Sequence, residues 1–193
     1  MRAFFYPAIL SLALPVFGAP PTPSEPSTTW LGATDEWTDE SNWSNGVPSE
    51  STSVLFNSMY TQNISTKGDI YVNDLIFGDG FALGDLGNYN IGVSKSLNVK
   101  GDLYYTNLRS AYYGGIRFSA GTGAIFTIEG DATFEARPLT DEQKQTYKDG
   151  TVDVQIGSAA TTYPMFGEFN LSGNLNLIGT SSYLSRVNLA AEL

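Results

Sequence analysis

The stretch Ser96-Leu-Asn-Val-Lys-Gly101-Asp102-Leu-Tyr-Tyr105 determines the fold that we expect. Apolar and polar residues alternate on both sides of Gly101 and Asp102, which predicts two short strands, each with one buried face. Glycine and aspartate suit the bend between the strands, because both tolerate positive φ and aspartate bonds to nearby backbone. The pattern apolar-x-apolar-x-Gly-[Asp/Asn]-apolar-x-apolar occurs in three other stretches, which begin at Asn63, Phe126 and Phe169.

The four bends recur at a nearly regular distance. Their glycines, at positions 68, 101, 130 and 173, are 33, 29 and 43 residues apart. The longest interval contains the polar segment 137–150, where Thr140 and Gln143 form a capping box and Gly150 is a stop, so we expect a short helix near 140–150. Without these 14 residues the interval returns to 29. A period of about 30 residues predicts the stacked coils of an all-β solenoid, with a β-sandwich as the alternative.

The solenoid interpretation also predicts which side chains stack. Each unit has the same phase relative to its glycine, so like inward positions should lie above one another: Ile70 and Val72, then Leu103 and Tyr105, then Ala132 and Phe134, then Leu175 and Leu177. The sequence supplies no cap after Leu177. We therefore expect an open C-terminal solenoid edge through which chains self-associate.

Composition excludes several classes of chemistry. The chain has 193 residues, a net charge of −10, no histidine and no cysteine. Ser-His-Asp and Cys-His catalysis, zinc sites built on those residues and disulfides are thereby removed. The acidic balance argues against nucleic acid as a partner. The bend acids Asp69, Asp102 and Asp131 recur at the same phase, and Asn174 takes their place in the fourth unit, which indicates a turn requirement. We therefore predict no catalytic or cofactor-binding residues and no enzyme. Calcium is the one metal that suits such oxygen ligands, and no metal-ligand residues are assigned.

The N-terminus predicts export. Met1-Arg2 is a positive start, the run 3–17 is uncharged and apolar, and Gly18 and Ala19 are small, which is the layout of a signal peptide over residues 1–18. The run is shorter than the ~20 apolar residues of a membrane span. Residues 19–29 contain four prolines and predict an extended linker. The solenoid domain is expected over 30–193, and the mature chain should have no membrane span.

All three tryptophans lie in the segment that starts this domain. Trp30, Trp37 and Trp43 form the pattern W-x-G-x4-W-x4-N-W-x2-G-V-P, which leads into a short apolar strand. Packing over the end of a solenoid is the simpler interpretation, so we expect an N-terminal cap at 30–57 and rungs at 58–193. The other interpretation is a carbohydrate-contacting platform on which the three rings stack against sugars.

This segment and the Gly-Asp units resemble the N-terminal part of secreted bacterial β-helix proteins with autotransporter-associated β-strand repeats. The resemblance implies a right-handed parallel β-helix (β-solenoid) with a role at the cell surface or in the extracellular matrix. Members usually continue into an outer-membrane barrel or a sorting tail, which the residues up to Leu193 do not provide, so a truncated C-terminus is expected.

The sequence therefore predicts two candidate functions. The first is a secreted or cell-surface structural or adhesive β-solenoid without catalytic activity, whose partner is an extracellular glycan or another surface component. The alternative is a β-helix protein that binds or degrades polysaccharide.

Overall fold

The computed structural model describes residues 25–57, 64–78, 89–107, 116–120, 123–136, 141, 152–156, 167–179 and 185–189. These ranges contain short strands and one 3-10 helix, η1 (Glu40–Asn42). The strands are β1 (Thr28–Thr29), β2 (Val54–Phe56), β3 (Ile64–Thr66), β4 (Asp69–Val72), β5 (Leu75–Phe77), β6 (Tyr89–Val93), β7 (Ser96–Val99), β8 (Leu103–Asn107), β9 (Ile116–Ala120), β10 (Ile125–Ile128), β11 (Ala132–Ala136), β12 (Val152–Ile156), β13 (Glu168–Leu171), β14 (Leu175–Ile178) and β15 (Ser185–Leu189).

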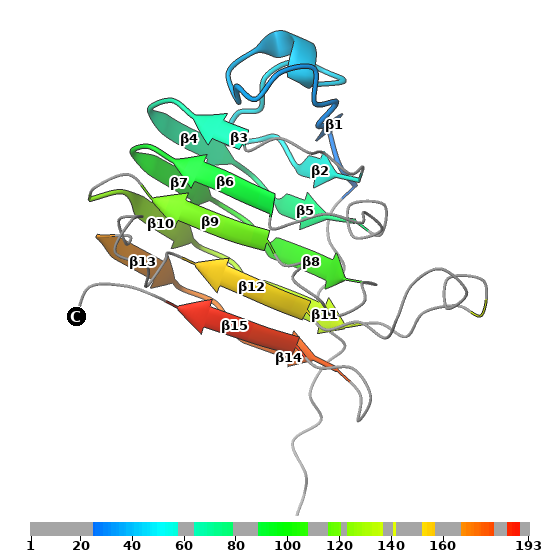
Figure 1. Ribbon diagram of the computed structural model, residues 1–193, viewed down its shortest axis with the longest axis vertical. Coiled ribbons are helices and arrows are strands. Elements are labelled where there is room, and N and C mark those ends of the chain that lie inside the picture. Colours follow the sequence, from blue (N-terminus) through cyan, green and yellow to red (C-terminus); the bar gives the residue numbers. More distant parts are fainter. Residues whose placement is uncertain are drawn as a thin grey trace, which may run out of the picture.

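The strands form three parallel sheets, so the all-β prediction is confirmed (Figure 1). The six-stranded sheet has the order β1-β2-β5-β8-β11-β14, the five-stranded sheet β15-β12-β9-β6-β3, and the four-stranded sheet β13-β10-β7-β4. From β2 onward the chain visits the six-, five- and four-stranded sheets in the same order on every pass. Each of these strands pairs in parallel with the strand three places along the chain, as in β5 with β8 and β8 with β11. An antiparallel sandwich is therefore not the observed arrangement.

Alternation along each strand builds a continuous apolar core. In the six-stranded sheet, Phe56 pairs with Phe77, Phe77 with Tyr105 and Tyr105 with Phe134, so their side chains form one inward column. Neighbouring ring centroids in this column are 5.1, 5.6 and 6.5 Å apart. A second row, Leu75, Leu103 and Ala132, is buried beside it. We call one pass of the chain through the three sheets a coil. Each coil buries its inner side chains mainly against the passes before and after it.

The expected stacking holds for three units and fails for the first. Leu103, Ala132 and Leu175 are paired in sequence, as are Tyr105, Phe134 and Leu177. Ile70 and Val72 do not lie above Leu103 and Tyr105, because they pair with Leu97 and Val99 in the four-stranded sheet. The residues that pair with Leu103 and Tyr105 are Leu75 and Phe77.

The misplaced unit follows from its bend. Gly68 lies between β3 and β4, at the corner from the five- to the four-stranded sheet. The bends at Gly101, Gly130 and Gly173 lie at the next corner, from the four- to the six-stranded sheet. At that corner the first coil has Asn73 and Asp74, which contain no glycine for the pattern to match. Asp102 follows Asp74 by 28 residues, and Asp131 follows Asp102 by 29 residues.

The expected start of the folded part at Trp30 also needs correction. Thr28 and Thr29 form β1 and pair with Val54 and Leu55, so the end of the proline-rich linker joins the six-stranded sheet. The buried hydroxyl of Thr28 accepts a hydrogen bond from the backbone N–H of Asn45 at 3.1 Å, which anchors the strand. The predicted signal peptide, most of the linker and, Asp141 apart, the predicted helix near 140–150 lie outside the described residues. In the part of the chain that the structure covers, no helix is long and apolar enough to cross a membrane.

Candidate functional site

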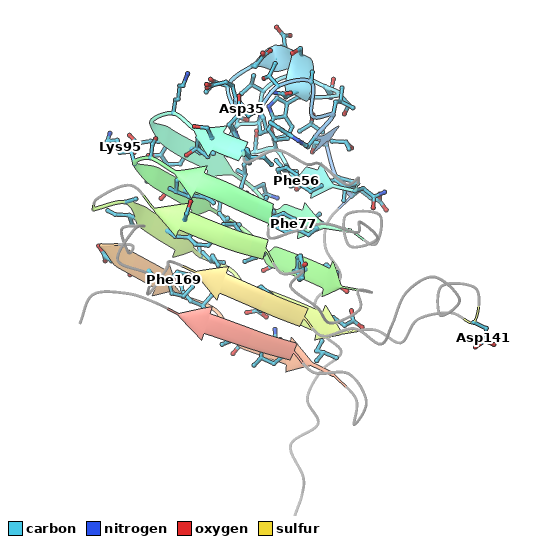
Figure 2. All side chains as sticks on the ribbon, in the orientation of Figure 1. Asp35, Phe56, Phe77, Lys95, Asp141 and Phe169 are labelled. Atoms are coloured by element: carbon cyan, nitrogen blue, oxygen red, sulfur yellow. The ribbon has the colours of Figure 1, made fainter. Side chains whose placement is uncertain are left out.

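The three tryptophans lie inside the N-terminal cap. Trp30, Trp37 and Trp43 are 1%, 0% and 4% exposed. The Trp30 and Trp37 rings each lie 4.9 Å from the Trp43 ring in edge-to-face contacts, and all three pack within 5.7–6.1 Å of Phe56 at the top of the inward column. Figure 2 shows Phe56 directly below the cap and Phe77 beneath it. Rings buried in this way offer no face to a sugar, so the structure supports the packing role and corrects the platform interpretation.

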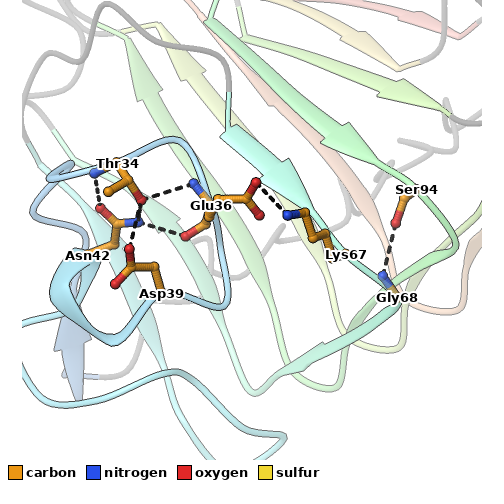
Figure 3. Close-up of polar contacts among 7 residues, drawn as sticks. All are labelled: Thr34, Glu36, Asp39, Asn42, Lys67, Gly68 and Ser94. Carbon is orange, nitrogen blue, oxygen red and sulfur yellow. Dashed lines mark hydrogen bonds and ion pairs between the residues drawn. The ribbon is translucent and has the colours of Figure 1, made fainter.

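A buried asparagine, which the sequence pattern did not predict as a structural residue, holds the cap together. Asn42 is 0% exposed, and its side-chain oxygen accepts the backbone N–H of Thr34 at 2.6 Å. Its amide nitrogen donates to Thr34 Oγ1 and to the carbonyl of Glu36, both at 2.7 Å (Figure 3). The signal in the sequence was the position of Asn42 next to Trp43 in the tryptophan pattern. If this asparagine is buried with the ring, both ends of its amide must find hydrogen-bond partners.

The acidic run of the cap is likewise used locally. Asp39 precedes η1 as its N-cap and accepts bonds from Ser41 Oγ at 2.7 Å and from the Ser41 backbone N–H at 2.9 Å. These bonds, with the Ser41 hydroxyl first, hold the pKa of Asp39 below its usual value. Glu36 pairs with Lys67 Nζ at 2.7 Å, linking the cap to the bend before β4 (Figure 3). Among the described residues, no three acidic side chains converge as a metal site would require.

The recurring bend aspartates form a ladder along one corner. We call Asp74, Asp102, Asp131 and Asn174 the aspartate ladder. Asp74 Oδ1 accepts the backbone N–H of Asp102 at 2.8 Å, and Asp102 Oδ1 accepts that of Asp131 at 2.8 Å. Asp131 Oδ1 then accepts the backbone N–H of Asn174 at 2.7 Å. Each carboxylate thereby ties its own coil to the following one by a charge-assisted bond.

The glycines beside the ladder make room for these carboxylates. A Cβ on Gly101 would overlap Asp74 Oδ1, and Cβ atoms on Gly130 and Gly173 would overlap the ladder carboxylate and the glycine carbonyl of the preceding coil. None of these three glycines has the positive φ that a glycine bend predicts. That reason holds at Gly68, whose φ is 85°. The ladder thus explains why glycine and aspartate occur together.

One outward face combines an aromatic ring with polar side chains. On the four-stranded sheet, the register places Tyr71, Asn98, Thr127 and Asn170 in a single outward column. The Tyr71 side chain is 43% exposed, whereas the cap tryptophans are closed off. The Asn98 amide donates to the carbonyl of Ile70 at 3.1 Å and to Ser96 Oγ at 2.9 Å, which fixes its orientation. We call this column the Tyr71 face.

An ion pair borders the Tyr71 face. The ammonium of Lys95 donates a hydrogen bond to Asp69, which also accepts from Ser96 Oγ at 2.7 Å. The Lys95 bond is the main reason that the pKa of Asp69 lies below its usual value and that the pKa of Lys95 lies above its own. Lys95 lies at the outer rim of the turn between β6 and β7 (Figure 2). The Asp69–Lys95 pair beside the exposed Tyr71 ring can contact polar ligands. Because the pKa of Asp69 is lowered, its carboxylate is a poor general base.

Comparisons with protein-family models, with curated proteins and with solved structures found no match.

Proposed function

We propose that this chain is a secreted structural component of the cell surface or extracellular matrix, built as a right-handed parallel β-helix. The observation that carries the proposal is the aspartate ladder. It joins successive coils at one corner, while the chain visits three parallel sheets in a fixed order. Such an arrangement is a repeating scaffold whose stability comes from neighbouring coils.

The use of the chemistry-bearing side chains supports a non-catalytic role. A general acid or base needs a carboxyl group within reach of a substrate proton. The described candidates are engaged in bonds to the fold: Asp74, Asp102 and Asp131 accept backbone N–H groups, and Asp39 caps η1. The recurring acids therefore act as structural acceptors.

Engineered disulfides test the coil architecture. The protein has no cysteine, so an Asn98→Cys, Thr127→Cys pair introduces the only two thiols. These positions are register partners on adjacent parallel strands, and the strand separation of about 4.8 Å lies within the Cα range of disulfides. Mild oxidation should form an intramolecular bond. The control pair Asn98→Cys, Asn176→Cys lies on two different sheets and should stay reduced. Failure of the first pair, or equal bridging of both, contradicts the coil.

Export and activity are tested separately. A secretion-competent host that expresses the full-length chain should release protein whose N-terminus is Ala19. This is the cleavage position that the signal-peptide layout favours. Intracellular retention of the uncut chain would contradict the secreted role. Incubation with acidic and neutral polysaccharides should release no oligosaccharide, and catalytic release would overturn the non-catalytic part.

Glycan binding at the Tyr71 face is the second candidate function. The exposed ring can stack on a sugar, and the amide and hydroxyl groups of Asn98, Thr127 and Asn170 repeat about every 4.8 Å, close to the advance of an extended sugar chain. A glycan array should show a linear polysaccharide bound by the wild type and lost in Tyr71→Ala. Leu31→Ala, at an exposed position of the cap, is the matched control that should keep binding. No bound glycan, or equal binding by Tyr71→Ala, removes this candidate.

A further inference from the structure

The amide of Asn98 on the Tyr71 face has a fixed orientation. Its nitrogen donates to the carbonyl of Ile70 at 3.1 Å and to Ser96 Oγ at 2.9 Å, so both of its N–H bonds are used within the fold. Because a carbonyl oxygen can only accept, the nitrogen of the amide and not its oxygen must face Ile70. No described residue donates a hydrogen bond to the Asn98 side-chain oxygen. The face therefore presents an acceptor whose position is set before a ligand binds.

This fixed acceptor restricts the chemistry of the ligand. A sugar hydroxyl can donate a hydrogen bond to Asn98 Oδ1, whereas a carboxylate or sulfate group has only acceptor atoms and is repelled there. Thr127 is the next residue of the outward column, and its hydroxyl makes no hydrogen bond with the described residues, so it can donate or accept. Asn98 and Thr127 thus match the hydroxyl-rich edge of a neutral sugar chain.

The two lysines beside the Tyr71 face are each held by a carboxylate. Lys95 comes directly before β7, and its ammonium donates to Asp69. Lys100 comes directly after β7, and its ammonium donates to Glu129. These two bonds are the main causes of the raised pKa of both lysines, and the Tyr71 side chain adds to each increase. Tyr71 thus lies between two ion pairs.

The face offers no free ammonium group to an anion. Each of the three lysines that the structure describes, Lys67, Lys95 and Lys100, is paired with a carboxylate. Glu168, in the same outward column as Asp69, adds an acid that has no cationic partner among the described residues. The chain as a whole carries a net charge of −10, which repels a polyanion before contact.

We infer that the Tyr71 face selects a neutral, extended β-linked polysaccharide over acidic polysaccharides, and that Asn98 is the residue that recognises the sugar hydroxyls. The inference rests on the glycan-binding candidate function and narrows that candidate to one chemical class. The sugar chain runs across the strands, with one ring stacked on Tyr71 and the following hydroxyl groups over Asn98 and Thr127, because these positions repeat at the strand spacing of about 4.8 Å. The two ion pairs border its path.

Two cellulose ethers with the same β-linked backbone test the selectivity. Hydroxyethyl cellulose is neutral, and carboxymethyl cellulose is anionic. In native gels that contain one polymer or the other, the full chain should be retarded by the neutral polymer and not by the anionic one. Equal retardation by both, or a preference for carboxymethyl cellulose, overturns the inference and leaves the glycan-binding candidate standing. Retardation by neither polymer also overturns it, and an empty glycan array then removes the candidate function as well.

A charge variant tests why acidic polymers are excluded. The double substitution Asp69→Asn, Glu129→Gln removes both carboxylate partners at partly exposed positions and frees the Lys95 and Lys100 ammonium groups. This variant should be retarded by carboxymethyl cellulose at low salt and released at high salt, because exposed charges are screened. If it ignores the anionic polymer at low salt, the ion pairs are not the reason for the selectivity and the inference is wrong.

Truncation of the fixed acceptor tests the role of Asn98. Asn98→Ala should weaken binding of hydroxyethyl cellulose about tenfold, because one hydrogen bond to the sugar is lost. Asn176→Ala is the matched control: this half-buried amide donates to Thr133 Oγ1 at 3.2 Å on the six-stranded sheet, so its loss should leave binding unchanged. Tryptophan fluorescence in urea shows that each variant folds, and Thr127→Val, which keeps the side-chain volume, should weaken binding in the same way. Wild-type binding by Asn98→Ala or by Thr127→Val contradicts the assignment.

Discussion

Replacing Gly101 by alanine tests how the aspartate ladder is built. A Cβ at this position would overlap Asp74 Oδ1, with Asp74 Cγ and the Asn73 carbonyl at 3.2 and 3.3 Å. The carboxylate would have to leave its place, and its bond from the backbone N–H of Asp102 would be lost. The backbone φ of Gly101 is not in the positive region, so no conformational strain adds to this effect.

The expected loss of unfolding free energy has two contributions. Losing a hydrogen bond to a charged group costs about 1.5–3 kcal/mol, and crowding by the remaining close atoms adds about 1 kcal/mol. Alanine restricts the unfolded chain and offsets about 0.4–1 kcal/mol. Gly101→Ala should therefore destabilise the protein by about 1.5–3.6 kcal/mol.

Urea denaturation followed by tryptophan fluorescence measures this loss, because the cap tryptophans are buried only in the folded protein. In an Asp74→Ser background, Gly101→Ala should cost less than about 0.5 kcal/mol. Serine already occupies the same position one coil earlier, at Ser53, where the structure accommodates Asn73 above it. Gly92→Ala is the matched control, since its Cβ would make only ordinary contacts at 3.5 and 3.7 Å. The reasoning is refuted if Gly101→Ala costs as little as Gly92→Ala, or costs the same in both backgrounds.

Leu103→Ala, at a fully buried position, should lower the unfolding free energy by about 2–5 kcal/mol. Leu175→Ala should cost clearly less, because the Leu175 side chain is 46% exposed, and equal losses in urea denaturation would contradict this reasoning. Trp37→Ala should cost about 3–5 kcal/mol without changing glycan binding, and a loss of binding in a folded variant would revive the sugar platform. Lys95 lowers the pKa of Asp69 in the folded state, so the ionised carboxylate stabilises the fold at neutral pH and this contribution disappears as pH falls through the folded pKa. Lys95→Met should raise the Asp69 pKa in an NMR titration and reduce the loss of stability in acid; an unchanged pKa would exclude the ion pair as its cause.

The repeat was predictable where glycine and a short polar residue occur together. Gly101, Gly130 and Gly173 all precede a ladder residue at the same corner. The first ladder residue, Asp74, was missed because Asn73 stands before it in place of glycine. Glycine is needed only where the neighbouring residue in the preceding coil is a ladder carboxylate. The neighbour of Asn73 in the preceding coil is Ser53, so no glycine is needed there. A pattern of residue types could not reveal this dependence on the coil below.

The cap was predictable as a segment but not in its internal arrangement. The spacing of the three tryptophans identifies a distinct unit without showing whether the rings point inward or outward. That choice depends on Phe56, on which all three rings pack, and on Asn42, which joins two parts of the segment from the inside. Likewise, β1 forms because it pairs with Val54 and Leu55, and the proline-rich sequence before Trp30 does not predict this pairing.

The connections at the different corners of the coil differ in how much their lengths vary. This makes the protein suitable as a scaffold for displaying foreign peptides. The ladder corner is nearly constant, with the connections 73–74, 100–102, 129–131 and 172–174. The connections from the six- to the five-stranded sheet vary widely, as 57–63, 78–88, 108–115, 137–151 and 179–184. An epitope grafted into one of these longer connections leaves every ladder bond in place. Grafts in successive coils would then stand in a row at the spacing of the strands, about 4.8 Å apart at their bases.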